Sequence, residues 1–317
     1  DGFSSQDYPA MGYSLRYEYG LFKQKIINNW QTELPDIWLP GGEVWLTLRS
    51  DKVYNIRFGG RVEKILKDGK DTYQHLDYRE VEAVPYDLMV SGAEAEAVSV
   101  LRLWRSQNIR NFNLKSFTQG NYLEAMREYN EADLITKILY PADDHPEGKE
   151  LRLKQQYFLV SASIQNIVQD HMRYYGDIRS FAEHVAIHIN DTHPALCIPE
   201  LMRIFIDDFA LSYDEAWDLV TKTVNYTNHT VMWEALERWP ESLVQKLLPR
   251  IHLLLEELNL HLYKTLQQKG VSNYEDLLII HNGEVRMANL CVFASGKVNG
   301  VSKLHTEIIK TSIFKGF

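Results

Sequence analysis

The hydrophobic pattern of this 317-residue chain changes near Asn121, and the change limits the folds that the chain can adopt. Before that point, polar and apolar residues alternate in short runs, which predicts strands. After it, apolar residues recur at helical spacing, which predicts amphipathic helices. A short strand expected at residues 184–189 lies between two of these helices. The order strand, loop, helix and strand predicts one α/β domain with a partly parallel sheet flanked by helices.

Local signals refine the expected elements. Lys67-Asp68-Gly69-Lys70 contains the Asp-Gly pair of a tight hairpin. Ser212 and Glu215 have the spacing of a capping box, and Pro194 suits the first turn of a helix. Besides the strand at 184–189, strands are expected at residues 13–22, 53–58, 61–65, 80–84, 98–104 and 277–280, and helices at 123–139, 150–172, 194–209, 212–224, 241–268, 287–294 and 301–311.

Composition excludes several classes of protein. The chain has 34 Lys and Arg against 43 Asp and Glu, so its net charge of −9 makes nonspecific nucleic-acid binding a poor interpretation. Its apolar runs are too short for a membrane span. Cys197 and Cys291 are too few for a disulfide scaffold or a four-cysteine zinc site, and their apolar contexts predict buried thiols. We expect a cytoplasmic protein.

The polar loop Asn190-Asp191-Thr192-His193 is the best candidate site by position. Open α/β sheets bind ligands at the carboxyl ends of their strands, beside the next helix. A simpler interpretation is that Asp191 or Thr192 caps the helix that begins at Pro194. The polar segment 225–230, which contains His229, is a second candidate wall of the same pocket.

Other polar clusters have weaker interpretations. His188, Asp191 and His193 could form a metal triad, but their spacing matches no zinc signature, so we predict no metal site. Asp143 and Asp144 lie in an acidic loop that either gates a site or only connects two helices. The acidic pairs at 207–208 and 256–257 are interpreted as solvent-facing.

A series of motifs in constant order resembles the α-glucan phosphorylase family, which includes glycogen, starch and maltodextrin phosphorylases. The resemblance extends from Tyr8 to Phe317. Its most specific segment is 147–158, Glu-Gly-Lys-Glu-Leu-Arg-Leu-Lys-Gln-Gln-Tyr-Phe. The other segments are residues 8–13, 15–26, 60–63, 83–87, 101–104, 111–114, 190–194, 226–231, 234–240, 298–302 and 304–307.

The resemblance implies an activity, a cofactor and a fold. Members of the family transfer a glucosyl unit from the non-reducing end of an α-1,4-glucan to phosphate, giving α-glucose 1-phosphate with retention. Pyridoxal phosphate is bound to a lysine as a Schiff base, and two Rossmann-like domains of the GT-B type enclose the site. The Asn-Met-Lys-Phe motif that carries the lysine does not occur in this sequence. Residues 1–317 are therefore expected to be a partial amino-terminal, glucan-side domain, truncated at both ends and without the cofactor-binding domain.

Carried over residue by residue, the resemblance implies a set of substrate-binding positions. His229 matches a histidine whose backbone carbonyl holds the glucosyl 6-hydroxyl, and Thr230 lies beside it. Asp191 and His193 match residues that line the pocket next to the glucosyl group. Asp144 falls in a gating loop where many members have Asn. The resemblance places no catalytic group, cofactor-binding residue or metal ligand in this chain.

Two functions stay open at this stage, besides the less favoured metal-dependent hydrolase that would use His188, Asp191 and His193. In the first, the chain is part of an α-glucan phosphorylase, inactive by itself, whose helix at residues 121–137 matches the family's subunit contact and implies a homodimer. In the second, it is a noncatalytic carbohydrate-binding or dimerising module derived from the same domain. Glucan binding without phosphate-dependent turnover would distinguish the second from the first.

Overall fold

The computed structural model describes residues 1–317 except 68–69, 109–111, 233–235 and 273. The chain separates into two compact units. Unit 1 consists of residues 1–57 and 80–163, and unit 2 consists of residues 58–79 and 164–317. The boundary falls inside the long helix α4 (Pro146–Tyr175), after Ser163.

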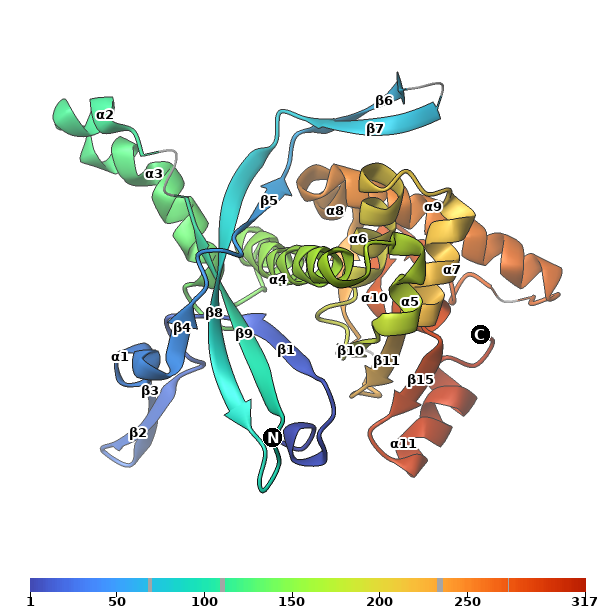
Figure 1. Cartoon of the computed structure of the whole chain (residues 1–317), viewed down its shortest axis with the longest axis horizontal. Helices are drawn as coiled ribbons and strands as arrows, with labels where there is room; N and C mark the ends of the chain where they lie inside the picture. The colour runs from blue at the N-terminus through green and yellow to red at the C-terminus, as the bar shows by residue number, and fades with distance from the viewer. Residues whose placement is uncertain (68–69, 109–111, 233–235, 273) are drawn as a thin grey trace. The chain divides into compact units, whose positions relative to one another are not determined.

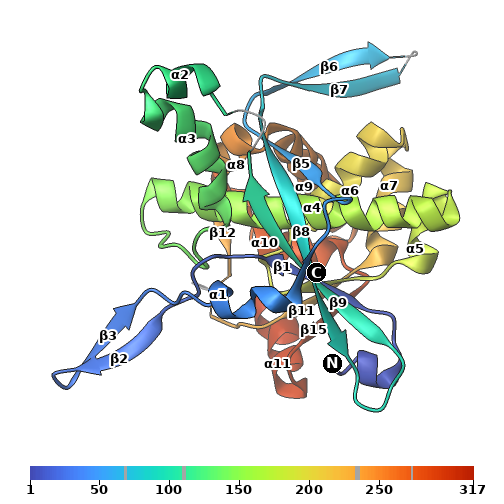
Figure 2. The same ribbon diagram turned by 60° about the vertical axis from the view of Figure 1, so that its left-hand side comes forward.

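Unit 1 is built on a mostly antiparallel sheet with the order β1-β9-β8-β4, and β5 also pairs with β8. The longest pairing is the antiparallel one between β8 and β9, with Glu82 opposite Gln107 at one end and Ser91 opposite Val98 at the other. β1 lies parallel to β9. Figure 2 shows the hairpin β2–β3 extending away from these strands. The elements are β1 (Met11–Leu15), β2 (Lys23–Ile27), β3 (Trp30–Leu34), α1 (Leu39–Gly42), β4 (Leu46–Leu48), β5 (Tyr54–Phe58), β8 (Arg79–Ser91), β9 (Val98–Gln107), α2 (Leu114–Thr118) and α3 (Tyr122–Asp133), with 3-10 turns at Ser4–Gln6, Glu43–Trp45 and Leu134–Thr136.

Unit 2 contains a three-stranded parallel sheet with the order β10-β11-β15, which confirms the expected parallel arrangement. A small antiparallel sheet, β12-β14-β13, and the hairpin β6–β7 complete its strands. The strands are β6 (Arg61–Lys67), β7 (Lys70–Leu76), β10 (Ile187–Asn190), β11 (Val224–Asn228), β12 (Arg238–Pro240), β13 (Ile280–His281), β14 (Glu284–Arg286) and β15 (Lys297–Gly300). The helices are α5 (Phe181–His184), α6 (Cys197–Arg203), α7 (Tyr213–Thr223), α8 (Glu241–Leu247), α9 (Pro249–Gln268), α10 (Met287–Ala294) and α11 (Lys303–Ile308), with a 3-10 turn at Ile178–Ser180 and π-helical turns at Ile204–Asp208 and Ile309–Ile313.

The single helix expected at residues 241–268 is wrong. The structure has two helices, α8 and α9, because Pro249 cannot continue the helix that precedes it. Leu248 between them has φ −134° and ψ 60°, outside the helical region. The expected strand at 184–189 also begins later, since His184 is the last residue of α5. The expected strand at 277–280 is wrong for residues 277–279: β13 consists only of Ile280 and His281.

Other local predictions are confirmed. Ser212 accepts a hydrogen bond from the Glu215 amide, and the Glu215 side chain accepts one from the Ser212 amide, so the capping box opens α7. The predicted hairpin places β6 antiparallel to β7, with Lys67 opposite Lys70, although its turn residues lie outside the described ranges. Cys197 and Cys291 are buried free thiols, and burial raises the pKa of Cys197 to about 12. Among the helices that the structure describes, none is long and apolar enough to cross a membrane.

Candidate functional site

The carboxyl ends of three parallel strands meet at one edge of the sheet in unit 2 (Figure 1). β11 is central: Asn190 of β10 lies opposite Thr227, and Asn228 lies opposite Gly300 of β15. Most of the side chains at these strand ends are polar. We call this set the carboxyl edge, and it consists of Asn190, Asp191, Asn228, His229, Asn299 and Gly300. Such an edge is the usual ligand position in open α/β sheets.

His229 joins the ends of two strands. Its Nε2 atom lies 2.6 Å from Oδ1 of Asn190, the last residue of β10. An amide oxygen only accepts, so Nε2 of His229 carries the proton in this arrangement. Both side chains are exposed, and the remaining polar atoms can reach a ligand in solvent.

Asp191 begins the loop after β10 in a left-handed backbone conformation, with φ 69°. Its amide donates to the Thr227 carbonyl at 3.1 Å, and its Oδ1 accepts from the Thr192 amide at 2.6 Å. The first of these bonds ties the loop to β11. The helix-cap interpretation is confirmed in part: Asp191 satisfies the Thr192 amide before Pro194, but α6 begins only at Cys197 and has no side-chain cap of its own.

A buried hydrogen-bond chain supports the peptide that precedes His229. Asn228 is fully buried, and it donates through Nδ2 to the Tyr226 hydroxyl at 3.0 Å. Its Oδ1 lies 3.0 Å from Nε2 of His305, near the start of α11. Burial raises the pKa of Tyr226, so its hydroxyl stays protonated. The sequence motifs contained these residues, but no local pattern predicted that they meet.

Gly300 permits the close approach of α11 to the end of β15. A Cβ atom at this position would lie 2.8 Å from the His305 ring and 2.9 Å from the Thr306 amide. The Gly300 amide donates to Oγ1 of Thr306 at 3.0 Å. A glycine is therefore required where His305 reaches Asn228.

The side chains considered as a metal triad, those of His188, Asp191 and His193, do not come together in the structure. Nε2 of His188 lies 2.7 Å from Oγ1 of Thr227, which donates to Oδ1 of Asn299 at 3.0 Å. Among the residues that the structure describes, His188, Asp191 and His193 do not bring three ligand atoms within reach of one ion. The three residues thus have different surroundings, and His188 belongs to a hydrogen-bond chain that crosses the sheet.

The remaining site predictions lie on loops. His193 is partly buried in the same loop as Asp191, and Oγ1 of Thr230 accepts from the Met232 amide at 3.2 Å. Asp144 is exposed and belongs to unit 1, whereas the other four predicted residues belong to unit 2. The substrate-binding roles of all five residues stay predictions.

The acidic loop around Asp144 is held at both ends. Asp143 pairs with Arg152 of α4 at 3.5 Å, and Nδ1 of His145 accepts from the Gly148 amide at 3.0 Å. A Cβ atom on Gly148 would overlap the Ala142 carbonyl oxygen, so only glycine fits there. Asp144 therefore projects from an anchored loop.

The interpretation of the two acidic pairs as solvent-facing is confirmed for Asp208 and Glu256, which are 54% and 52% exposed, and is wrong for Asp207 and Glu257. Asp207 accepts two hydrogen bonds from Arg250 at 2.8 Å, and its side chain is only 12% exposed. Glu257 accepts from the Tyr73 hydroxyl at 3.5 Å, and burial raises its pKa. Helical periodicity predicted a solvent-facing surface because a pattern within one helix does not show which other elements pack on it. Here the hairpin β6–β7 packs on α9.

The carboxyl edge does not supply the amine that pyridoxal phosphate needs for a Schiff base. Its residues include no lysine, and Lys297 of β15 lies at the opposite, amino end of that strand. The residues at this edge instead offer carbonyl, amide, imidazole and carboxylate groups. These groups suit hydrogen bonds to the hydroxyls of a sugar.

The comparisons with a family model and with known proteins all point to phosphorylases. The family model described as carbohydrate phosphorylase matches residues 1–317. The chain is 43% identical to the glycogen phosphorylase of Chlamydia trachomatis, 40% identical to that of Bacillus subtilis and 42% identical to the brain form of the human enzyme. Each comparison covers 100% of this chain but only 39–40% of the relative. The chain spans about two fifths of the length of these curated relatives.

Proposed function

The chain belongs to the carbohydrate phosphorylase family, and from that premise we propose that it forms the glucosyl-binding wall of an α-glucan phosphorylase. The complete protein would move a glucosyl unit from the non-reducing end of an α-1,4-glucan to phosphate. The observation that carries the proposal is the carboxyl edge, where Asn190 and His229 from neighbouring strands meet at 2.6 Å. The mixed α/β architecture is compatible with the Rossmann-like, GT-B arrangement that we propose for the complete protein.

The chain's residues would bind and orient the sugar. The backbone carbonyl of His229 would accept from the glucosyl 6-hydroxyl, and the bond to Asn190 would hold its loop in place. Asp191, His193 and Thr230 would line the pocket beside the glucosyl group. Pyridoxal phosphate, when bound in the complete protein, would supply a phosphate group for proton transfer. The carboxyl edge has no lysine to hold that cofactor, and residues 1–317 would be a partial glucan-side domain of a cytoplasmic enzyme.

A kinetic experiment on the complete protein tests this function. The unaltered protein should release glucose 1-phosphate from an α-1,4-glucan only when phosphate is present. His229→Ala should lower kcat/KM at least about tenfold, because a misplaced binding group loses orientation. His281→Ala on β13 is the matched control and should leave the rate unchanged.

Three outcomes would count against the proposal. Phosphate-independent release of sugar would indicate a hydrolase. Glucan binding with no phosphorolysis would favour the noncatalytic module. Phosphorolysis by the isolated 317-residue chain, which we expect to be inactive, would contradict the assignment of residues 1–317 to one wall of the site.

Asp144 is proposed to lie in a gating loop, where its charge would repel phosphate. Asp144→Asn in the complete protein should lower the KM for phosphate. Asp143→Asn is a matched control, because Arg152 already neutralises that carboxylate. An unchanged KM in Asp144→Asn, or equal changes in both variants, would exclude the repulsive gate.

We also propose that α3, within the predicted segment 121–137, contacts a second copy of the protein. Leu123 is 88% exposed and Tyr122 is 59% exposed at the start of α3. Together they form an exposed apolar surface, which is typical of a protein–protein contact. Leu123→Asp should shift the complete protein from dimer to monomer in sedimentation. Leu66→Asp introduces the same charge at another exposed leucine and should leave the dimer intact.

A further inference from the structure

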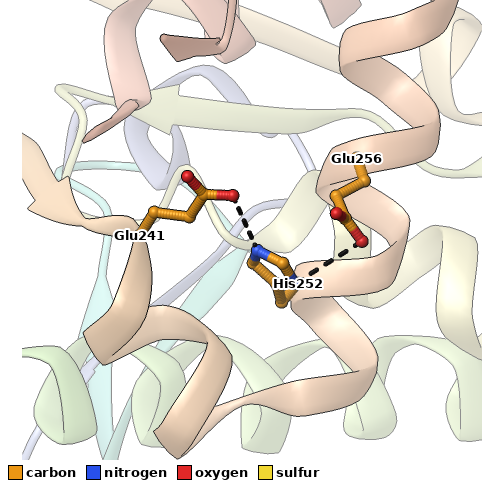
Figure 3. Close-up of side chains that lie close together, drawn as sticks. All are labelled: Glu241, His252 and Glu256. Atoms are coloured by element: carbon orange, nitrogen blue, oxygen red, sulfur yellow. Dashed lines mark hydrogen bonds and ion pairs between the residues drawn. The ribbon is translucent and has the colours of Figure 1, made fainter. Parts of the chain in front are cut away.

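Three metal-ligating side chains converge where α8 turns into α9 (Figure 3). Glu241 is the first residue of α8, His252 lies near the start of α9, and Glu256 lies one turn further along α9. Nε2 of His252 is 3.1 Å from Oε1 of Glu241, and Nδ1 is 3.6 Å from Oε2 of Glu256. We call these three residues the corner cluster. None of them is among the residues proposed to bind substrate.

The break between the helices creates the corner cluster. Glu241 and His252 are 11 residues apart, so in one continuous helix they would be separated by about 16 Å along the axis. The turn at Leu248 and Pro249 instead brings them within hydrogen-bond distance. His252 and Glu256 share a face of α9 because they are four residues apart.

The burial of the corner cluster suits an ion that enters from solvent. The side chain of His252 is 4% exposed, whereas those of Glu241 and Glu256 are 30% and 52% exposed. The imidazole is therefore fixed by the surrounding protein, and the two carboxylates face outward. A partly open site of this kind provides both a rigid ligand and an entry path.

Electrostatics within the corner cluster also favours a cation. Its ligand atoms lie within 4.8 Å of one another, so two carboxylates repel each other beside one imidazole. A neutral imidazole has one N–H group and can donate to only one of the carboxylates. Since Nε2 and Oε1 of Glu241 are at hydrogen-bond distance, Nε2 is the donor, and the lone pair of Nδ1 faces Glu256. A metal cation between Nδ1 and Glu256 removes this conflict, in competition with a proton for the same lone pair of Nδ1.

The spacing agrees with zinc coordination. Zn–N and Zn–O bonds of about 2.1 Å at a tetrahedral angle place the two ligand atoms about 3.4 Å apart. The observed 3.6 Å between Nδ1 of His252 and Oε2 of Glu256 is close to this value and too long for a good hydrogen bond. An imidazole together with a carboxylate favours zinc over magnesium or calcium.

We propose that the corner cluster is a zinc site. Nδ1 of His252 and the carboxylate of Glu256 bind the ion, and water completes the coordination. Nε2–H of His252 donates to Glu241, which fixes the tautomer and the orientation of the ring, as carboxylates behind metal-bound histidines do. Bound zinc links His252 and Glu256 across one turn of α9 and stabilises the native fold, because the unfolded chain has no such site.

Zinc titration of the 317-residue chain tests the proposal, by calorimetry and by thermal melting in ZnCl2. We expect one zinc per chain and a higher Tm. Glu256→Gln should weaken binding at least about a hundredfold because it removes a ligand. Glu241→Gln should weaken it about tenfold because it removes only the orienting carboxylate. Glu183→Gln removes an exposed carboxylate from α5 and should leave the affinity unchanged.

Cobalt substitution provides a second measurement. Co²⁺ bound to the unaltered chain should give the visible absorption of a low-coordinate site, and Glu256→Gln should abolish it. Glu256 is half exposed, so this variant keeps the test valid even if substitution of the buried His252 prevents folding. Failure of the unaltered chain to bind zinc, or equal affinity in Glu256→Gln, would overturn the proposal. Equal losses in Glu256→Gln and Glu183→Gln would show nonspecific binding and overturn it too.

Discussion

A buried ion pair in unit 1 and the carboxyl edge in unit 2 use polar side chains in opposite ways. Asp87 of β8 is 1% exposed and accepts two hydrogen bonds of 2.7 Å from Arg102 of β9. Arg49 adds a third contact at 3.3 Å. At the carboxyl edge, Asn190 and His229 are exposed and meet through one bond. The buried polar groups of the ion pair are satisfied by the protein itself, whereas the exposed side chains of Asn190 and His229 retain capacity for a ligand.

The largest loss of stability is expected when the buried ion pair of unit 1, Asp87 with Arg102, is broken. Asp87→Ala leaves Arg102 buried without its partner and should cost about 3–5 kcal/mol of unfolding free energy. Hydrogen exchange in β8 and β9, together with urea denaturation, measures the loss. Asp51→Ala removes an exposed partner of Arg49 and should cost measurably less. Equal losses in the two variants would show that burial of the pair is not decisive.

A smaller loss of stability is expected at Gly300 of the carboxyl edge, where α11 packs closely against β15. Gly300→Ala forces a Cβ against the His305 ring and the Thr306 amide, and should cost about 1–3 kcal/mol. Faster hydrogen exchange in β15 and α11 would locate the effect. Gly2→Ala, where a Cβ meets no atom within 4 Å, is the control. An unchanged Gly300→Ala variant would mean that α11 can move away from β15 at no cost.

Asn190→Ala should separate stability from function most clearly. It removes one exposed hydrogen bond, so the free energy of unfolding should fall by about 1 kcal/mol or less. In the complete protein, the same variant should lower kcat/KM for phosphorolysis, and Asn190→Asp, which keeps the acceptor, should recover part of it. A large loss of stability would place Asn190 with Asp87 as a structural residue.

The smallest effect on stability at neutral pH is expected from His261 of α9. Burial lowers its pKa, and Nδ1 accepts from the Tyr213 hydroxyl at 3.1 Å. Its folded pKa lies below the unfolded value of about 6.5, so its stabilising contribution is present above that pH and is lost as the pH falls through the folded pKa. The Tm should fall more between pH 7 and pH 5 in the unaltered chain than in His261→Gln. A parallel pH dependence in both proteins would contradict this role, and His281→Gln serves as the control.

Much of the local structure could be predicted because it depends on neighbouring residues. α10 has the predicted bounds, Met287–Ala294, since its apolar residues follow one helical pattern. The capping box at Ser212 was predictable for the same reason. The helix break at Pro249 could also have been predicted, but the apolar periodicity on both sides of the proline concealed it. The substrate roles came from the family resemblance and not from these local patterns.

The sequence by itself determined the order of the elements, the polar ends of the parallel strands and the spacing of His252 from Glu256. Only the tertiary structure decided which groups meet. His229 contacts Asn190 across 39 residues, and His305 contacts Asn228 across 77. The helix corner brings Glu241 to His252. Periodicity reports which residues share a face of one element, but contacts between elements depend on strand register and turn geometry, which arise only when the chain packs.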